Sequence, residues 1–214
     1  MFKTIITSIS IVFMICSVFA EDPKPIQLPA PDTTGGMPLM QALQLRHSTR
    51  EFASDTLSTK LLSNLLWAAC GINRVESGKR TAPTAMNKQE IDLYVASAHG
   101  LYLYYPKSHS LNLMIPDDIR AVTGVQDYVK DAPINFVYVA DYAKIDYPSE
   151  NDKLRYTSAD AAFIAQNVYL FAASESLATV VRGAIDIEKL AAAMKLRPDQ
   201  HIILAQTVGF PKSH

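Results

Sequence analysis

Two arginines and a histidine stand close together in the sequence, with two hydroxyl residues among them. Arg46 and His47 are followed by Ser48, Thr49 and Arg50. Guanidinium forks and Ser/Thr hydroxyls are groups that bind a phosphate ester. The cluster also follows a predicted helix, and cations favour the negative end of a helix dipole. The spacing alone therefore leaves two interpretations open, a phosphate clamp and a charged, solvated helix end.

A polar loop with two amide side chains comes before a predicted strand. It runs over residues 81–89 and contains Asn87 and Gln89, whose amides carry both donors and acceptors. That combination suits the edge of a planar heterocycle, and an ordinary surface turn has the same composition. Further along, Gly183 would let the backbone approach a flat ligand closely, with a β-bulge as the alternative.

Other common site chemistries lack their sequence motifs in this chain. It has no His-x-x-x-His or Cys-x-x-Cys pair for a metal, no Gly-x-Ser-x-Gly nucleophile elbow and no Gly-x-Gly-x-x-Gly dinucleotide fingerprint. Cys70 ends an apolar run and is interpreted as a buried filler. We therefore expect no metal site, and we assign no catalytic side chain.

The helices and strands that position these residues are predicted to intermix, with hairpins between strands, which is the α+β class. Apolar periodicity predicts helices at 38–45, 58–69, 157–174 and 187–194, and strands at 91–98, 101–105, 134–140, 177–181 and 201–208. The third helix carries apolar side chains almost all round, so we expect it to be buried on nearly all sides. A domain of this size rarely buries one helix so fully, which favours a homodimer.

The first 20 residues have the pattern of a secretory signal peptide. Lys3 precedes an apolar stretch from Ile5 to Phe19, and Ala20 offers a small residue at a cleavage site. An uncleaved anchor is the alternative, but the stretch is short for a membrane span, which needs about 20 residues. We therefore expect export, to the periplasm, with no stable membrane insertion after cleavage.

The remaining residues are predicted to form an extended arm and one domain. Residues 21–36 are rich in Pro, Asp, Thr and Gly and are predicted to form an extended N-terminal arm. No linker or repeat follows, so residues 37–214 are predicted to be a single domain. The formal net charge of −1 gives no basic excess, and we expect no nucleic-acid partner.

Four short motifs, taken in order, resemble the nitroreductase family. They are Arg-x-Ser-x-Arg-x-Phe at 46–52, Ala-Pro-Thr-Ala-x-Asn-x-Gln at 82–89, Gln-Asn at 166–167 and Gly-Phe-Pro at 209–211. Each motif is weak alone, but their order and separation are specific, and the resemblance covers residues 37–214. It implies a nitroreductase-like fold with a central, mostly antiparallel sheet flanked by helices. It also implies an intertwined homodimer with flavin mononucleotide (FMN) at the interface.

The resemblance also implies individual roles at that flavin. Arg46 and Ser48 match positions that hold the FMN phosphate. Arg50 matches a cation near the pyrimidine edge, where charge develops on the reduced ring. The 82–89 loop matches the segment that reaches the flavin from the partner subunit. The backbone of Arg182 and Gly183 matches the backbone segment that faces flavin N5. Lys212 matches a residue that adds to phosphate binding. In full, the cofactor-binding candidates are Arg46, His47, Ser48, Arg50, Pro83, Thr84, Asn87, Gln89, Arg182, Gly183 and Lys212.

Three departures from the family pattern bear on these assignments. Ser176 to Thr179 stand where the family usually has Gly-Leu-Gly-Thr, and Glu90 replaces the proline that often follows the Asn-x-Gln. The sequence stops three residues after Pro211, where relatives often carry more basic residues. Phosphate binding is therefore expected to depend mainly on Arg46 and Ser48.

The resemblance favours an FMN-dependent oxidoreductase. It would pass a hydride through flavin N5, in ping-pong fashion, from a small-molecule electron donor to a nitroaromatic, quinone or similar acceptor. One alternative is an FMN-dependent oxidase or dehydrogenase that acts on azoline rings of modified peptides. Another is a non-catalytic flavin-binding protein of the same fold. Export leaves the electron donor open, because NAD(P)H is largely confined to the cytoplasm.

Overall fold

The centre of the molecule is a seven-stranded sheet in the order β1-β6-β5-β4-β7-β9-β8. The computed structural model describes residues 24–212. The strands are β1 (Ile26–Gln27), β4 (Ile91–Ser97), β5 (Gly100–Tyr105), β6 (Ser110–Ile115), β7 (Ile134–Asp141), β8 (Ala178–Arg182) and β9 (Gln200–Gly209). Each pairing between neighbours in this sheet is antiparallel. The sheet and its flanking helices confirm the expected α+β class.

Strand β7 lies inside the sheet and is buried on both faces. It pairs with β4 on one side and with β9 on the other. Phe136 and Tyr138 pack into the core on one face of the sheet, and Val137 and Val139 pack into the core on the other. This explains the continuous apolar run that predicted a strand here, since a strand covered on both faces does not alternate with polar residues.

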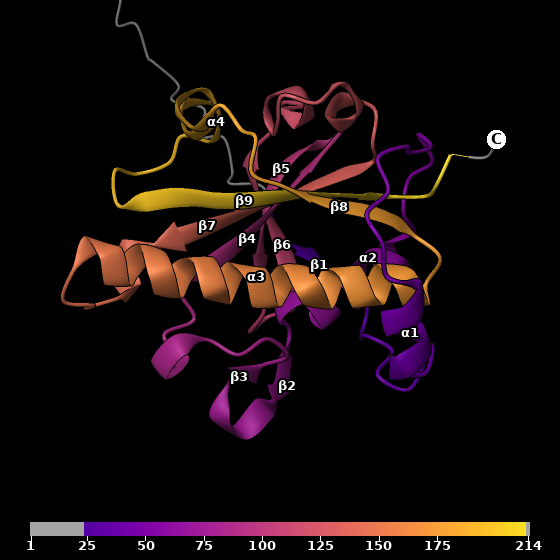
Figure 1. Cartoon of the computed structure of the whole chain (residues 1–214), viewed down its shortest axis with the longest axis horizontal. Coiled ribbons are helices and arrows are strands. Elements are labelled where there is room, and N and C mark those ends of the chain that lie inside the picture. Colours follow the sequence, from indigo (N-terminus) through magenta and orange to yellow (C-terminus); the bar gives the residue numbers. More distant parts are fainter. Residues whose placement is uncertain (1–23, 213–214) are drawn as a thin grey trace, which may run out of the picture.

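Helices cover both faces of the sheet (Figure 1). They are α1 (Leu39–Leu45), α2 (Thr59–Cys70), α3 (Glu150–Ser174) and α4 (Ile187–Met194). Helices α2 and α3 contribute to the core on one face, and α4 contributes to the core on the other. Ser58 caps α2 by accepting a hydrogen bond from the Leu61 amide at 3.2 Å, which confirms the predicted start of that helix.

Helix α3 differs from its prediction in both its start and its burial. It begins at Glu150, seven residues before the predicted start, because Ser149 accepts a hydrogen bond from the Asp152 amide and caps it there. Its buried residues, from Thr157 to Ala172, lie along one face, whereas Phe163 is 47% exposed. The expectation that the helix is buried on nearly all sides is therefore wrong for the single chain.

Two strands and one hairpin were not predicted from the sequence. Strand β1, in the predicted arm, pairs with β6, which was itself missed. A separate hairpin of β2 (Ile72–Arg74) and β3 (Lys79–Arg80) follows α2.

The predicted signal peptide at residues 1–20 lies outside the described residues. Among the described helices, none is both long and apolar enough to cross a membrane.

Helix α3 ends at a serine whose backbone adopts the left-handed helical conformation. Ser176 has φ 56°, and the next amide, of Leu177, donates to the carbonyl of Ala172 at 2.8 Å. This is a Schellman arrangement, in which glycine is preferred because a side chain strains the left-handed position. Ser176 stands where the family that the sequence resembles usually has glycine, so the departure retains the geometry at some cost in stability.

We predict that Ser176→Gly stabilises the protein by about 1 kcal/mol, because glycine adopts the left-handed conformation without strain. Urea denaturation followed by circular dichroism measures the change. Ser158→Gly is the matched control: it lies inside α3 and should destabilise by a similar amount. A destabilised Ser176→Gly protein would contradict the role given to this residue.

Candidate functional site

The candidate site lies along the outer edge of strand β8. This strand is at the end of the sheet, so one side of its backbone has no neighbouring strand. Thr179 accepts a hydrogen bond from the Thr49 amide at 3.0 Å, and the Val181 amide donates to the Tyr169 hydroxyl at 2.9 Å. The segment after α1 and a side chain of α3 therefore cover this edge in place of another strand.

Tyr169 brings the predicted phosphate-binding residues together. The Arg46 guanidinium lies over its ring, 5.2 Å from the centroid. The Ser48 hydroxyl lies 2.8 Å from the Tyr169 hydroxyl, and either can donate the hydrogen bond. Tyr169 was not predicted as a site residue, and its only sequence signal is its position two residues after the Gln166-Asn167 motif.

Two further predicted cations gather beside this segment. The chain end runs next to residues 51–53: the Ala53 amide donates to Phe210 at 2.9 Å and the Lys212 amide donates to Glu51 at 3.3 Å. Arg50 and Lys212 consequently line one cavity of about 430 Å³. Within residues 24–212, no carboxylate forms an ion pair with Arg46, Arg50 or Lys212.

Gly183 follows β8 and has a free amide. Thr179 and Val181 use their outward-facing backbone groups for protein contacts, and Gly183 is the next residue in that alternation. In the described part of the chain nothing accepts a hydrogen bond from its N–H. A Cβ added at this position would meet no atom within 4 Å. The backbone here is therefore open to a ligand, as predicted.

The side chain of Arg182 has a different role, inside the protein. It is 4% exposed and donates to Thr123 at 2.7 Å, to Asn135 at 2.9 Å and to Thr207 at 3.1 Å. Burial lowers the pKa of its guanidinium to about 10. Its charge is retained at neutral pH, and its hydrogen bonds fix the end of β8 from inside the protein.

His47 is held by a backbone carbonyl. Its Nδ1 lies 2.6 Å from the carbonyl of Leu45, so the ring is tied back to the end of α1. The imidazole is exposed. Of the predicted basic cluster, Arg46 and Arg50 are the side chains with no hydrogen bond or ion pair within the described chain.

The predicted amide loop has an unusual backbone. Met86, Asn87 and Gln89 have φ values of 51°, 53° and 53°, in a region that residues other than glycine adopt at a cost. Internal bonds hold this geometry: the Gln89 amide donates to Thr84 at 3.1 Å, and the Gln89 side chain donates to Asn87 at 3.1 Å. Pro83, at the start of the loop, is exposed.

One chain does not bring this loop to the edge of β8. The loop is anchored to α3 by the Ala85 amide, which donates to Asp160 at 2.8 Å. Tyr169, at the other set of residues, follows nine residues later on the same helix. At a rise of 1.5 Å per residue this is roughly 13 Å along the helix axis. The candidates thus form two separate groups within the single chain.

Glu90 lies beneath the loop and is fully buried. Within the described chain, neither of its carboxyl oxygens has a hydrogen-bond partner of normal geometry. Burial, and to a smaller extent the Asp160 carboxyl, raise the pKa of Glu90 to about 7, while its own backbone amide and, more weakly, Lys144 oppose the rise. The Glu90 carboxyl, which directly follows the strained loop in the chain, therefore ionises near neutral pH.

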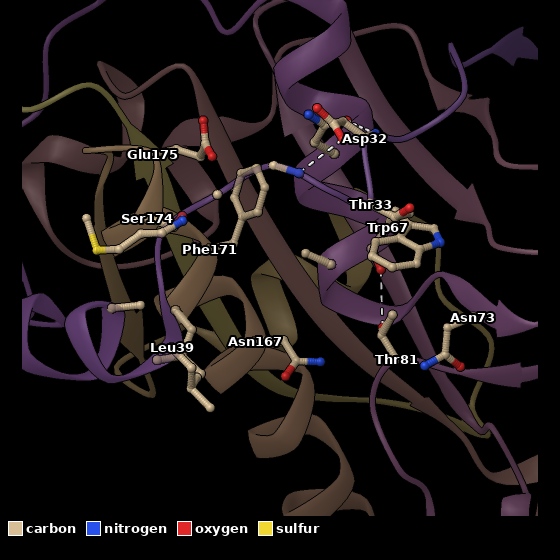
Figure 2. A pocket seen from close by; sticks show the side chains of 17 residues that line it. Asp32, Thr33, Leu39, Trp67, Asn73, Thr81, Asn167, Phe171, Ser174 and Glu175 are labelled. Atoms are coloured by element: carbon tan, nitrogen blue, oxygen red, sulfur yellow. Dashed lines mark hydrogen bonds between the residues drawn. The ribbon is translucent and has the colours of Figure 1, made fainter.

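A different cavity lies beside α1, α2 and α3 and has a volume of about 550 Å³. Figure 2 shows Trp67, Asn167 and Phe171 among the side chains around it. Asn167, from the Gln-Asn motif, donates to the carbonyl of Ala69 at 3.2 Å and so joins α3 to α2. None of the predicted cofactor residues lines this cavity, which separates it from the site at β8.

Comparison with known proteins supports one family. The model of the nitroreductase family matches residues 43–210. A protein of Methanocaldococcus jannaschii named as a nitroreductase is 29% identical over 198 residues, which cover 88% of this chain and 97% of that protein. A crystal structure from Ralstonia eutropha JMP134, also of a protein named as a nitroreductase, has a TM-score of 0.86 and 45% identity, and covers 90% of this chain and 91% of that one.

A further structure is informative about the fold. The crystal structure of a Desulfovibrio desulfuricans protein named as a nitroreductase, in complex with FMN, has a TM-score of 0.59 at 22% identity. It covers 84% of this chain and 89% of that one. The resemblance and the fold that were expected from the sequence motifs are both confirmed by these similarities.

The buried carboxyl predicts a specific pH dependence of stability. A carboxyl whose pKa is raised on folding stabilises the folded state below its ordinary pKa of 4.5, and this contribution is lost as pH rises through about 7. Glu90→Gln removes the charge and its amide can donate to Asp160. The variant should match the native protein at pH 4 and exceed its free energy of unfolding by roughly 1–3 kcal/mol at pH 8.

Chemical denaturation at both pH values measures this difference. Glu188→Gln, an exposed position on α4, is the control and should change stability equally little at both. A Glu90→Gln protein with the same pH dependence as the native one would show that the Glu90 carboxyl stays ionised.

Proposed function

The chain belongs to the nitroreductase family, and we propose that it is an FMN-dependent oxidoreductase. The observation that carries this proposal is the outer edge of β8. There, unpaired guanidinium groups and a serine hydroxyl lie along the strand edge that ends at the free amide of Gly183. A phosphate ester attached to a flat ring system needs these two features side by side.

The cation cluster fits the phosphate of FMN. Arg46 offers a forked donor, Ser48 offers a hydroxyl, and Lys212 adds a point charge from the end of the chain. Among the described residues, neither Arg46 nor Lys212 forms an ion pair with a carboxylate, so both charges are available to a dianionic phosphate. The similar D. desulfuricans protein was crystallised with FMN, which supports the same cofactor here.

The end of β8 fits the flavin ring. The side-chain-free backbone at Gly183 lets a flat ring approach, and its N–H is available to the ring edge. FMN supplies the hydride chemistry when it is bound. The chain's own residues bind and orient it, and the Arg50 cation favours negative charge on the reduced ring. An electron donor and then a nitroaromatic, quinone or similar acceptor would take turns over the same exposed face.

We propose further that the site is completed by a second copy of the chain. The 84–89 loop is roughly 13 Å along α3 from Tyr169, so its amides need another subunit to meet the flavin. Helix α1 offers an apolar surface for that contact, since Leu39 is 61% exposed, Met40 75% and Leu43 45%. Exposed apolar side chains that gather on one element are typical of an interface between subunits.

We predict that Arg46→Ala weakens FMN binding by about tenfold or more, because the phosphate loses its forked partner. Titration of the flavin-free protein with FMN, followed by flavin fluorescence, measures the change. Lys189→Ala is the control, since this exposed lysine lies on α4, which packs on the opposite face of the sheet from α3. Undiminished affinity in Arg46→Ala would place the phosphate elsewhere.

We predict that Met40→Glu turns a homodimer into monomers, because it introduces a charge into the proposed interface. Light scattering coupled to size-exclusion chromatography measures the mass. Ile187→Glu, an exposed apolar position on α4, should leave the dimer intact. A native chain that runs as a monomer at micromolar concentration would refute the two-subunit site, while FMN binding by that monomer would still support the phosphate cluster.

A further inference from the structure

A cavity of about 950 Å³ lies between the β2–β3 hairpin and the sheet. The hairpin extends below α3 in Figure 1. The cavity's lining includes Trp67 of α2, Arg80 of the hairpin, Tyr104 of β5 and Lys107 of the β5–β6 turn. It does not contain Arg46, Arg50, Gly183 or any other residue of the β8 edge. It is therefore distinct from the proposed phosphate and ring site.

Arg80 is the charged group that the protein leaves unsatisfied there. Its Nε is shielded from solvent and has no hydrogen-bond partner in the described chain. A guanidinium nitrogen makes one long hydrogen bond, of 3.4 Å, to the carbonyl of Ile91. No carboxylate within residues 24–212 forms an ion pair with Arg80. The Arg80 side chain is partly buried, and partial removal of an unpaired cation from water is costly, so an anion bound in the cavity would stabilise it.

The lining as a whole carries an excess of positive charge. Lys88 and Lys144 also line the cavity, but their charges are taken by Asp146 and Asp92, each at 2.6 Å. Asp92 is the single carboxylate in the lining. The charges of Arg80 and Lys107 are thus not neutralised by an ion pair among the described residues, and both can attract an anionic ligand in the cavity.

The aromatic residues of the cavity contribute no negative charge. Ser63 donates to the carbonyl of Pro29 at 2.5 Å, so the Nε2 of His109, 2.7 Å away, must be the donor to Ser63. The Nδ1 of His109 is then unprotonated and accepts from the Tyr104 hydroxyl at 2.8 Å. Burial raises the pKa of Tyr104 and lowers that of His109, so both side chains stay neutral.

We propose that this cavity binds a flat organic anion, with its carboxylate or phosphate held by Arg80 and its ring against Trp67 and Tyr104. The volume suits a ligand with a substantial organic part, since pockets for small organic molecules span about 300–1,000 Å³. Forked donors of arginine recognise both kinds of oxyanion.

This site goes beyond the proposed redox function and does not require it. Asn87 and Gln89 line the cavity as well, so an occupant touches the strained loop from the side of the hairpin. If the loop completes a flavin site, the anion also helps to hold it in place.

Trp67 makes the proposal testable, because it is the only tryptophan in the chain. Its fluorescence is followed while the purified protein is titrated with benzoate, phenyl phosphate, the neutral benzamide or inorganic phosphate. Benzoate or phenyl phosphate should change the emission in a saturable way, and which of the two binds more tightly identifies the oxyanion. Benzamide and inorganic phosphate should each bind at least tenfold more weakly. Benzamide binding as tight as benzoate would overturn the proposal.

Variants locate the bound anion. Arg80→Gln should weaken binding of the preferred probe about tenfold or more, the value of a charge-assisted hydrogen bond. Arg80→Lys keeps the charge but loses the forked donors, so its affinity for the probe should lie between those of the native protein and Arg80→Gln. Lys189→Gln on α4 lowers the net charge equally and should bind as the native protein does. Unchanged binding by Arg80→Gln, with native circular dichroism, would overturn the proposal.

Arg46→Ala separates this site from the flavin site. It should retain the fluorescence response to the preferred probe even where FMN binding is lost. Loss of the response in Arg46→Ala, with Arg80→Gln unaffected, would mean that the anion binds at the flavin site instead. A failure of FMN to bind the native protein would count against the proposed function only, since the anion titration needs no flavin.

Discussion

The exposed backbone edge of β8 is the constraint around which the candidate site is organised. An edge strand has unpaired N–H and C=O groups, and these must be covered or left open to water. Here the Thr49 amide and the Tyr169 hydroxyl take alternate positions along the edge. The segment that satisfies the strand therefore also carries Arg46 and Arg50, so the positions of the two arginines follow from a backbone requirement. Because this cover ends before Gly183, one amide is left over, and the cations and the open backbone come to lie side by side.

The sequence predicted the elements whose signal is local. Strand β7 is a long apolar run, and α2 has a capping serine at Ser58 and an apolar face, so both were found. Strand β1 is two residues long and exists only because it pairs with β6, a long-range contact that no periodicity of its own reveals. The start of α3 was missed for a related reason. Its first turns are polar and are held by the Ser149 cap, whereas the prediction followed the apolar residues further along.

The sequence predicted which residue types belong to the candidate site, but it could not predict which of their side chains face outward and which face the protein interior. Arg46, Ser48, Arg50 and Lys212 are brought to one region, because the chain end packs beside the segment after α1. Arg182 carries the same charge but turns inward, where Thr123, Asn135 and Thr207 accept its hydrogen bonds. Those acceptors come from distant segments, so the sequence could not separate a ligand-binding arginine from a structural one. Tyr169 was missed because its importance comes from what it contacts across the fold, and its sequence position inside an apolar helix resembles that of any core residue.

The 84–89 loop shows how substitutions in this chain alter the family pattern without removing its geometry. Three residues other than glycine have positive φ there, and a strained loop persists only where its surroundings hold it. The surroundings in this case are Asp160, which accepts from Ala85, and Glu90, in place of the usual proline. Burial, and to a smaller extent the neighbouring Asp160 carboxyl, raise the pKa of Glu90 to about 7, so the Glu90 side chain ionises near neutral pH. Asp160 thus anchors the loop and disfavours the charged form of Glu90, so the strained conformation should be most stable when Glu90 is protonated and most easily displaced when it is ionised.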